Sequence, residues 1–207
     1  NGPIMVEGAE KGDVIAVHIK SIRPRGPNPR GTCCMIPQFG ALSGTSLTAL
    51  LSDSLPEIVR KIDVDEDGVY WSRRVTLPYK PHIGTLSCSP EIDSINTLTP
   101  DAHGGNMDLP DMGPGSITYL PVQTAGGRLF IGDAHACQGD GEVGVFQVNL
   151  RCSVLRDAGP EFKSALWSRP IPLASVRTIS IASMSGWSAR KVCASDQSAI
   201  GPFTRPP

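Results

Sequence analysis

The chain has 207 residues, a formal net charge of −1 and a charged fraction of 19%, so it carries no excess of positive charge for a nucleic acid or an acidic membrane surface. No apolar run approaches the roughly 18 residues that a transmembrane helix needs, and no secretion signal opens the sequence. The six cysteines form no Cys-x-x-Cys pair, which predicts a reduced protein of the cytoplasm.

Glycine and proline are frequent, with 22 and 19 copies, and runs rich in Val, Ile and Thr separate them. This pattern predicts a mainly β fold with many turns and few short helices. In chain order, we expect strands at residues 4–6 and 14–19 around a turn at Gly12. A solvated Pro/Gly-rich loop follows over residues 23–31, and residues 47–55 form a short helix or a loop.

Residues 63–68 read Asp-Val-Asp-Glu-Asp-Gly and match the start of an EF-hand calcium loop. Such a loop needs a bidentate glutamate at its twelfth position, and here that position holds Arg74. The flanking residues alternate as strands do, not as helices do. We therefore predict an acidic hairpin turn here and no calcium site.

Further along, residues 77–90 predict a strand, a loop and a second strand, with His82 at the mouth of a pocket. Residues 116–122 predict another strand. After Arg151 the pattern weakens, although residues 171–181 are compatible with one more strand. We expect weak order beyond them because the composition there is rich in Ser, Arg and Pro.

The most informative stretch is residues 128–150, which predicts a hairpin around the turn at residues 138–141. Successive side chains of a strand point to opposite faces, so Asp133 and His135 share one face. If the loop has about six residues, Glu142 stands opposite His135 on the partner strand. Three ionisable side chains then converge, and burying them without a function is costly.

A second polar segment holds His103, Asn106 and Asp108. Mixed histidine and carboxylate ligands suit Zn²⁺ or a similar divalent ion with an open position for water. A carboxylate that does not bind the metal acts as general base, which fits hydrolysis of an amide or an ester. Two alternatives stay open: Cys137 acts as a nucleophile beside His135, or the carboxylates only cap turns and pair with arginines.

Five motifs of the chain resemble the acetamidase/formamidase family. They are GPIMVEGAEKGDVIAV at residues 2–17, IPQFGAL at residues 36–42, PHIGTLSCSP at residues 81–90, HGGNMDLPDMGPGSITYLPV at residues 103–122 and GDAHACQGDGEV at residues 132–143. The last two are long and specific. Together the motifs extend over about residues 2–150.

The resemblance implies a jelly-roll-like β-sandwich that hydrolyses short aliphatic amides to a carboxylate and ammonia. It also implies a divalent metal, with zinc as the first expectation and calcium as the alternative. On this sequence the expected metal ligands are His103, Asp108, Asp133 and His135. The expected catalytic residues are Glu142, as the base, and Asp140; the expected substrate pocket includes Asn106, Gln138 and His82.

We expect the family-like β domain to extend over residues 1–162, without the family's N-terminal portion, and a diverged or weakly ordered tail to occupy residues 163–207. The expected partners are a small amide substrate and further copies of the chain in a homo-oligomer. Formamide and acetamide differ by one methyl group, which a pocket distinguishes by only about 1–3 kcal/mol. Two alternatives to an active amidase are a metal- or ligand-binding β-sandwich without catalysis and an inactive truncated member of the family.

Overall fold

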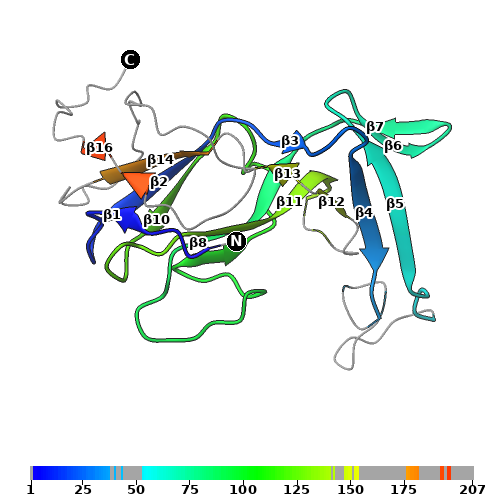
Figure 1. The fold of residues 1–207 in the computed structure, drawn as a ribbon. Coiled ribbons are helices and arrows are strands. Elements are labelled where there is room, and N and C mark those ends of the chain that lie inside the picture. Colours follow the sequence, from blue (N-terminus) through cyan, green and yellow to red (C-terminus); the bar gives the residue numbers. More distant parts are fainter. Residues whose placement is uncertain are drawn as a thin grey trace, which may run out of the picture.

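The structure is a computed structural model. It describes residues 2–37, 40, 43, 53–140, 142, 147–150, 152–153, 176–181, 192–193 and 195–196. Every regular element among these residues is a β-strand, which confirms the mainly β class (Figure 1). The few short helices that the composition predicts do not occur in this part of the chain. Most of the helix or loop expected at residues 47–55 lies outside the described residues.

The largest sheet has eight antiparallel strands and contains most of the residues of interest. Its strand order is β7 (Val75–Leu77), β6 (Val69–Ser72), β5 (Ile58–Val64), β4 (Arg30–Met35), β12 (Gln147–Leu150), β11 (Phe130–Gln138), β8 (His82–Ser87) and β9 (Gly104–Asn106). The nine-residue strand β11 lies between the two ends of the molecule in Figure 1.

A second sheet of four strands has the order β10 (Ile117–Pro121), β2 (Val14–Ile19), β14 (Val176–Ile181) and β16 (Ser195–Asp196). Two short pairs complete the described strands: β1 (Val6–Glu7) with β15 (Val192–Cys193), and β3 (Arg23–Pro24) with β13 (Cys152–Ser153). Strand β14 pairs in parallel with all six residues of β2. The strand expected within residues 171–181 is therefore present, whereas most of the predicted tail lies outside the described residues.

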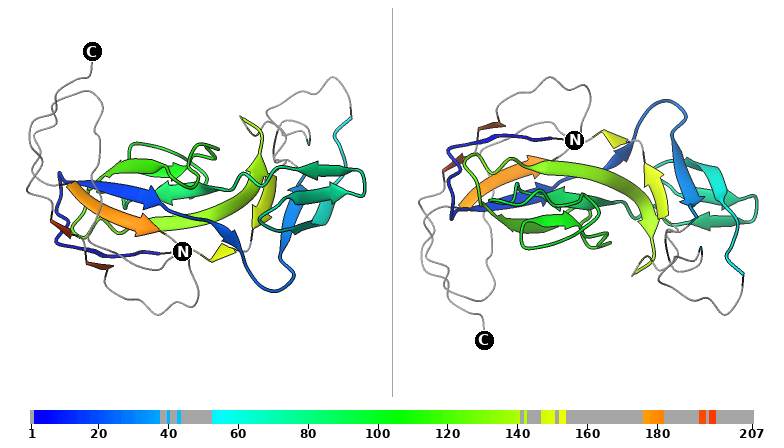
Figure 2. Two further views of the ribbon diagram at one scale, coloured as in Figure 1. Left: turned by 90° about the horizontal axis from the view of Figure 1, so that it is seen from above. Right: turned by 90° about the horizontal axis from the view of Figure 1, so that it is seen from below.

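The larger core lies between the two sheets and makes the fold a sandwich. It joins Ile15 and Val17 of β2 with Leu120 of β10 on one side, and with Leu86 of β8 and Ile131 of β11 on the other. Burying each of these aliphatic side chains contributes about 1.5–3 kcal/mol. Figure 2 views the molecule from above and from below, and in both views β2 and β14 lie over the green strands. One face of β8 and β11 is therefore packed against the four-stranded sheet.

A smaller core lies at the other end of the eight-stranded sheet. Its buried members among the described residues are Cys33, Ile62, Val64, Val69, Ala136 and Val148. Because Ala136 belongs to β11, this strand contributes to both cores. No helix in the described part of the chain is long and apolar enough to cross a membrane.

The acidic motif at residues 63–68 forms the predicted hairpin turn between β5 and β6. One carboxylate oxygen of Asp65 accepts backbone hydrogen bonds from Asp67 (2.9 Å) and Gly68 (3.0 Å), and Tyr70 donates its hydroxyl to the same carboxylate at 2.9 Å. The hydrogen bond from Tyr70 and the two backbone bonds lower the pKa of Asp65. The aspartate therefore stabilises a turn.

Candidate metal and active site

Strand β11 departs from regular alternation at Asp133. Ile131 and Ala134 both lie in the larger core, although residues three apart on a regular strand point to opposite faces. Asp133, between them, has a left-handed backbone with φ of 54°, which turns the chain over by one position. The strained residue therefore decides which side chains of β11 face away from the core.

Strand β8 follows the same pattern beside it. Ile83 and Leu86 lie in the larger core, paired in register with Ala134 and Ile131. The next pair along the strands, His82 with His135, therefore lies on the opposite face. Both histidine side chains are nevertheless fully buried, and their rings stack with centroids 4.8 Å apart.

Three possible ligand side chains meet on this outer face. Nε2 of His135 lies 3.2 Å from Oδ2 of Asp133 and 3.6 Å from Oδ1 of Asp108. All three ligand atoms lie within 4.8 Å of one another. The prediction that Asp133 and His135 share one face agrees with this geometry. Asp108 arrives from the segment after β9.

Asp108 is held by hydrogen bonds to its side chain and its backbone. Asn106 donates its amide to Oδ2 of Asp108 at 2.8 Å, and Thr85 donates its hydroxyl to Oδ1 of Asn106 at 2.6 Å. The side-chain amide of Gln138 donates to the backbone carbonyl of Asp108 at 2.7 Å. Asn106 and Gln138, expected in the substrate pocket, thus both contact Asp108. Such partners orient a ligand and raise metal affinity.

His82 supports the cluster from beside His135. Its Nε2 lies 3.3 Å from Oε1 of Gln138 and its Nδ1 lies 3.4 Å from the carbonyl of Lys80. Burial, and then the neighbouring His135, lower the pKa of His82. The lowered pKa favours a neutral His82, whose ring packs on that of His135.

Glu142 reaches the cluster from the loop between β11 and β12. Burial raises its pKa to about 8, and a side-chain hydrogen bond to Asp108 and the negative charges of Asp108 and Asp133 add to the effect.

Glu142 does not stand opposite His135 in the hairpin, as a loop of about six residues would require. The strands close at Gln138 and Gln147, and His135 pairs with Asn149, because the loop is longer than six residues.

The other candidates lie farther away. Asp140 is exposed and does not belong to the group of possible ligands. Among the described residues, His103 also lies outside the group of possible ligands, so its assignment as a ligand stays a prediction. Its backbone carbonyl accepts a hydrogen bond from Cys88, beyond the end of β8. The register of β8 and β9 brings Asn106 opposite Thr85, close to the cluster, and carries His103 away from it.

Backbone strain is concentrated at the cluster. Four non-glycine residues in the described part of the chain have positive φ, and three of them are Asp108 (43°), Asp133 (54°) and Glu142 (41°). Such conformations cost on the order of 1–3 kcal/mol each and persist where the surroundings impose them, often at functional sites. The fold thus holds three carboxylates together at an energetic cost.

The cluster fits a divalent cation. Nε2 of His135 and Oδ1 of Asp108 are buried and have no hydrogen-bond partner, and each unsatisfied group costs about 1–3 kcal/mol. A cation between them satisfies both atoms. Gly84 leaves the necessary space: a Cβ there would lie 2.8 Å from Nε2 of His135 and 2.9 Å from Oδ2 of Asp133. Two oxygens and one imidazole nitrogen suit zinc.

Sequence reasoning assigned no role to Gly84 or Thr85, although both belong to the motif PHIGTLSCSP. Gly84 keeps the centre of the cluster open, and Thr85 anchors Asn106. The available signal was the glycine two residues after His82, inside an otherwise apolar strand, because such a glycine often marks a close approach of other groups.

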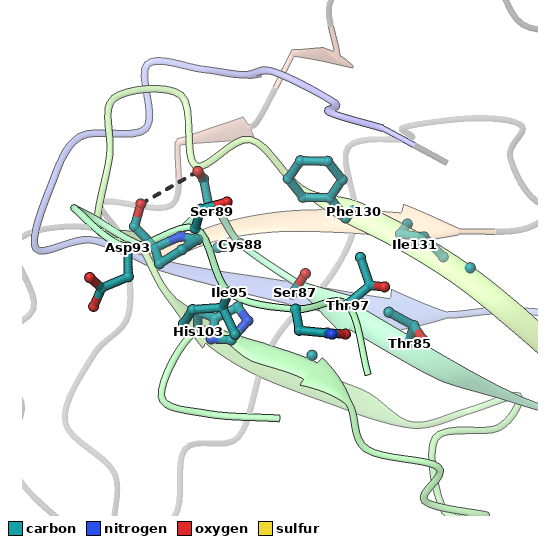
Figure 3. Close-up of a pocket in the computed structure, with 15 residues that line it drawn as sticks. Thr85, Ser87, Cys88, Ser89, Asp93, Ile95, Thr97, His103, Phe130 and Ile131 are labelled. Atoms are coloured by element: carbon teal, nitrogen blue, oxygen red, sulfur yellow. Dashed lines mark hydrogen bonds between the residues drawn. The ribbon is translucent and has the colours of Figure 1, made fainter. Parts of the chain in front are cut away.

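Two cavities lie along the eight-stranded sheet. One, of about 370 Å³, is lined by residues of β8 and β11, by the segment after β8 and by His103 (Figure 3). The other, of about 680 Å³, is mostly apolar and includes Cys33, Trp71, Cys137 and Gln138.

Burial raises the pKa of Cys137, which favours the unreactive thiol. This observation argues against the alternative of a Cys137 nucleophile.

Comparison with known proteins adds to the geometry. The sequence model of the Acetamidase/Formamidase family matches residues 1–96 and 91–164. The crystal structure of acetamidase from Yersinia enterocolitica is 73% identical, with a TM-score of 0.69, over 72% of this chain and 46% of that chain. A predicted acetamidase/formamidase from Thermoanaerobacter tengcongensis is 37% identical, with a TM-score of 0.61, over 71% of this chain and 46% of that one.

Formamidase from Methylophilus methylotrophus is 28% identical over 195 residues, which are 69% of this chain and 46% of that protein. The chain therefore spans about half the length of the relatives that it matches. The family match includes both segments that supply the cluster, since Asp108, Asp133 and His135 all lie within residues 91–164. The chain belongs to the Acetamidase/Formamidase family.

Proposed function

We propose that the protein hydrolyses short aliphatic amides, such as formamide and acetamide, to a carboxylate and ammonia with the help of a divalent metal. The observation that carries this proposal is the convergence of Asp108, Asp133 and His135 around two buried atoms without partners. The family supports the substrate class, since its relatives include proteins named formamidase and acetamidase.

Asp108, Asp133 and His135 are the proposed ligands. When bound, the metal would polarise the amide carbonyl and lower the pKa of water. Zinc is favoured over calcium because calcium takes six to eight oxygen ligands, whereas this group contains a buried imidazole. Asn106 and Gln138 would keep Asp108 in position through their hydrogen bonds, while His82 would keep the ring of His135 in its plane.

Glu142 is the proposed general base. Its carboxyl group lies beside Asp108, and a divalent cation at the cluster would favour the ionised carboxylate by opposing the negative charges of Asp108 and Asp133. In this proposal the carboxylate takes a proton from water as the oxygen bonds to the carbonyl carbon. It then gives this proton to the amide nitrogen as the C–N bond breaks. The balance is one amide and one water converted to a carboxylic acid and ammonia, which ionise to carboxylate and ammonium.

The experiment is ammonia release from formamide and acetamide by the purified chain, measured before chelation, after chelation and after zinc is restored. We expect activity that disappears with the chelator and returns with zinc. Full activity after complete metal removal would contradict the metal-dependent mechanism. A folded, zinc-loaded chain that releases no ammonia would favour the alternative of a binding sandwich without catalysis.

A further inference from the structure

The cavity of about 370 Å³ begins one residue away from the metal cluster along both central strands. Thr85, which lines the cavity, follows Gly84, and Gly132, which also lines it, precedes Asp133. Thr85 and Gly132 are paired in register across β8 and β11. Figure 3 shows Thr85 and Ile131 on these strands with Thr97 nearby, and Ile95 beside His103 farther along the cavity.

The cavity and the cluster share one face of the sheet. Leu86 and Ile131 form the adjacent pair and belong to the core, so the pair of Thr85 and Gly132 points away from the core. A continuous chain of hydrogen bonds joins the two sites as well. It runs from Thr85 to Asn106 (2.6 Å) and from Asn106 to Asp108 (2.8 Å).

The lining of the cavity suits an uncharged chain. It combines apolar side chains such as Ile95 and Phe130 with neutral hydroxyl groups such as those of Ser87 and Thr97. Asp93 is the only carboxylate among the lining residues, and they include no lysine or arginine. An anionic group would therefore find no guanidinium or ammonium partner there. The volume is within the range of about 300–1,000 Å³ typical of small-molecule sites, far more than a formyl or acetyl group fills.

We propose that this cavity receives the acyl chain of an uncharged primary amide longer than acetamide, such as butanamide or hexanamide. The inference rests on the proposed function, because it assumes that the carbonyl group lies at the metal cluster. The cavity then makes acyl-chain length the main determinant of specificity, with Ile95 and Thr97 forming part of its wall.

The test compares kcat/KM for acetamide, butanamide and hexanamide with the zinc-loaded chain. Burying one methylene stabilises a complex enough for about a three- to fourfold gain, so kcat/KM should rise with each added carbon. Ile95→Trp fills the cavity and should lower kcat/KM for hexanamide by about tenfold or more, with less than about a twofold effect on acetamide.

Ile92→Trp is the matched control. Ile92 lies three residues from Ile95, is 88% exposed and does not line the cavity, so this variant should keep the specificity of the parent. Thr97→Trp adds a second filling variant at an exposed lining position, in case Ile95→Trp does not fold. Rates that fall steadily from acetamide to hexanamide, or filling variants with unchanged specificity, would overturn the proposal.

Binding of hexanamide, followed by ligand-observed NMR, gives a measurement that needs no turnover. The parent chain and Ile92→Trp should bind it, and both filling variants should bind it at least about tenfold more weakly. Binding with this pattern but without ammonia release would refute the amidase proposal and leave the cavity as a ligand site. Ammonia release without any effect of the filling variants would refute the cavity assignment and leave the amidase proposal intact.

Discussion

Nε2 of His135 lies 3.2 Å from Oδ2 of Asp133, two residues earlier on the same strand. The imidazole is fully buried, whereas the carboxylate side chain is 35% exposed. The two groups therefore span the boundary between core and solvent, where a bound ion is shielded on one side and reachable by water on the other.

Replacing His135 with alanine should remove both zinc binding and amide hydrolysis. The substitution deletes the nitrogen ligand and leaves two carboxylates without it, and loss of several kcal/mol of metal stabilisation corresponds to on the order of a 10³-fold fall in kcat/KM. Metal content after dialysis and ammonia release measure the effect. His18→Ala, which changes a histidine of the other sheet, should retain both properties. A His135→Ala chain with parental zinc content would contradict the ligand assignment.

Adding a single methyl group at Gly84 should disrupt the cluster without changing any charge. The new Cβ would lie 2.8 Å from Nε2 of His135 and 2.9 Å from Oδ2 of Asp133, so these groups must move apart. We expect Gly84→Ala to lose zinc and to destabilise the fold by about 1–3 kcal/mol. Calorimetric titration with zinc and thermal unfolding measure the two effects. The control is Gly139→Ala, since a Cβ at Gly139 meets no atom within 4 Å. Equal zinc affinity in the two variants would show that the ion does not bind beside Gly84.

Glu142→Gln should separate catalysis from metal binding. The amide keeps the size of the side chain but cannot accept a proton from water, so kcat should fall about 10²- to 10⁴-fold while zinc content stays unchanged. Asp140→Asn makes the same change at an exposed carboxylate on the same loop and should keep most of the activity. If Asp140→Asn lost activity and Glu142→Gln kept it, the roles of the two carboxylates would be reversed.

The β5–β6 turn predicts a pH-dependent contribution to stability from Asp65. Its pKa is lowered in the folded protein, mainly by the hydroxyl of Tyr70. A lowered carboxyl pKa stabilises the fold above the ordinary value of 3.8, and this stabilisation disappears as the pH falls through the lowered pKa. Tyr70→Phe should therefore lower the unfolding temperature at neutral pH, with a difference that shrinks in acid.

Tyr79→Phe is the control for the Asp65 turn. The hydroxyl of Tyr79 donates to the backbone carbonyl of Ile22 at 2.9 Å, and this acceptor does not titrate. Thermal unfolding between neutral and acidic pH should show a constant loss for Tyr79→Phe. A loss for Tyr70→Phe that is equally constant would mean that the charge of Asp65 does not contribute.

The sequence alone determined the features that depend on neighbouring positions along the chain. Alternation within a strand placed Asp133 and His135 on one face, and turn chemistry identified the acidic hairpin at residues 63–68. The motifs around residues 103–122 and 132–143 identified the family. Each of these inferences needs only the local geometry of a strand or turn, or a match of consecutive residues, so no knowledge of the partner strands was required.

Only the tertiary structure decided which distant residues meet. The pairing of β8 with β9 brings Asp108 to the cluster and carries His103, five residues earlier, away from it. The contact between β8 and β11 assigns Gly84 its role as the open centre. The loop after β11, longer than expected, moves Glu142 out of the strand and still brings it to Asp108. The packing of the larger core on the other side of the sheet fixes the strand register and the left-handed backbone at Asp133. Because that packing joins segments far apart in the chain, the sequence pattern of one segment does not predict it.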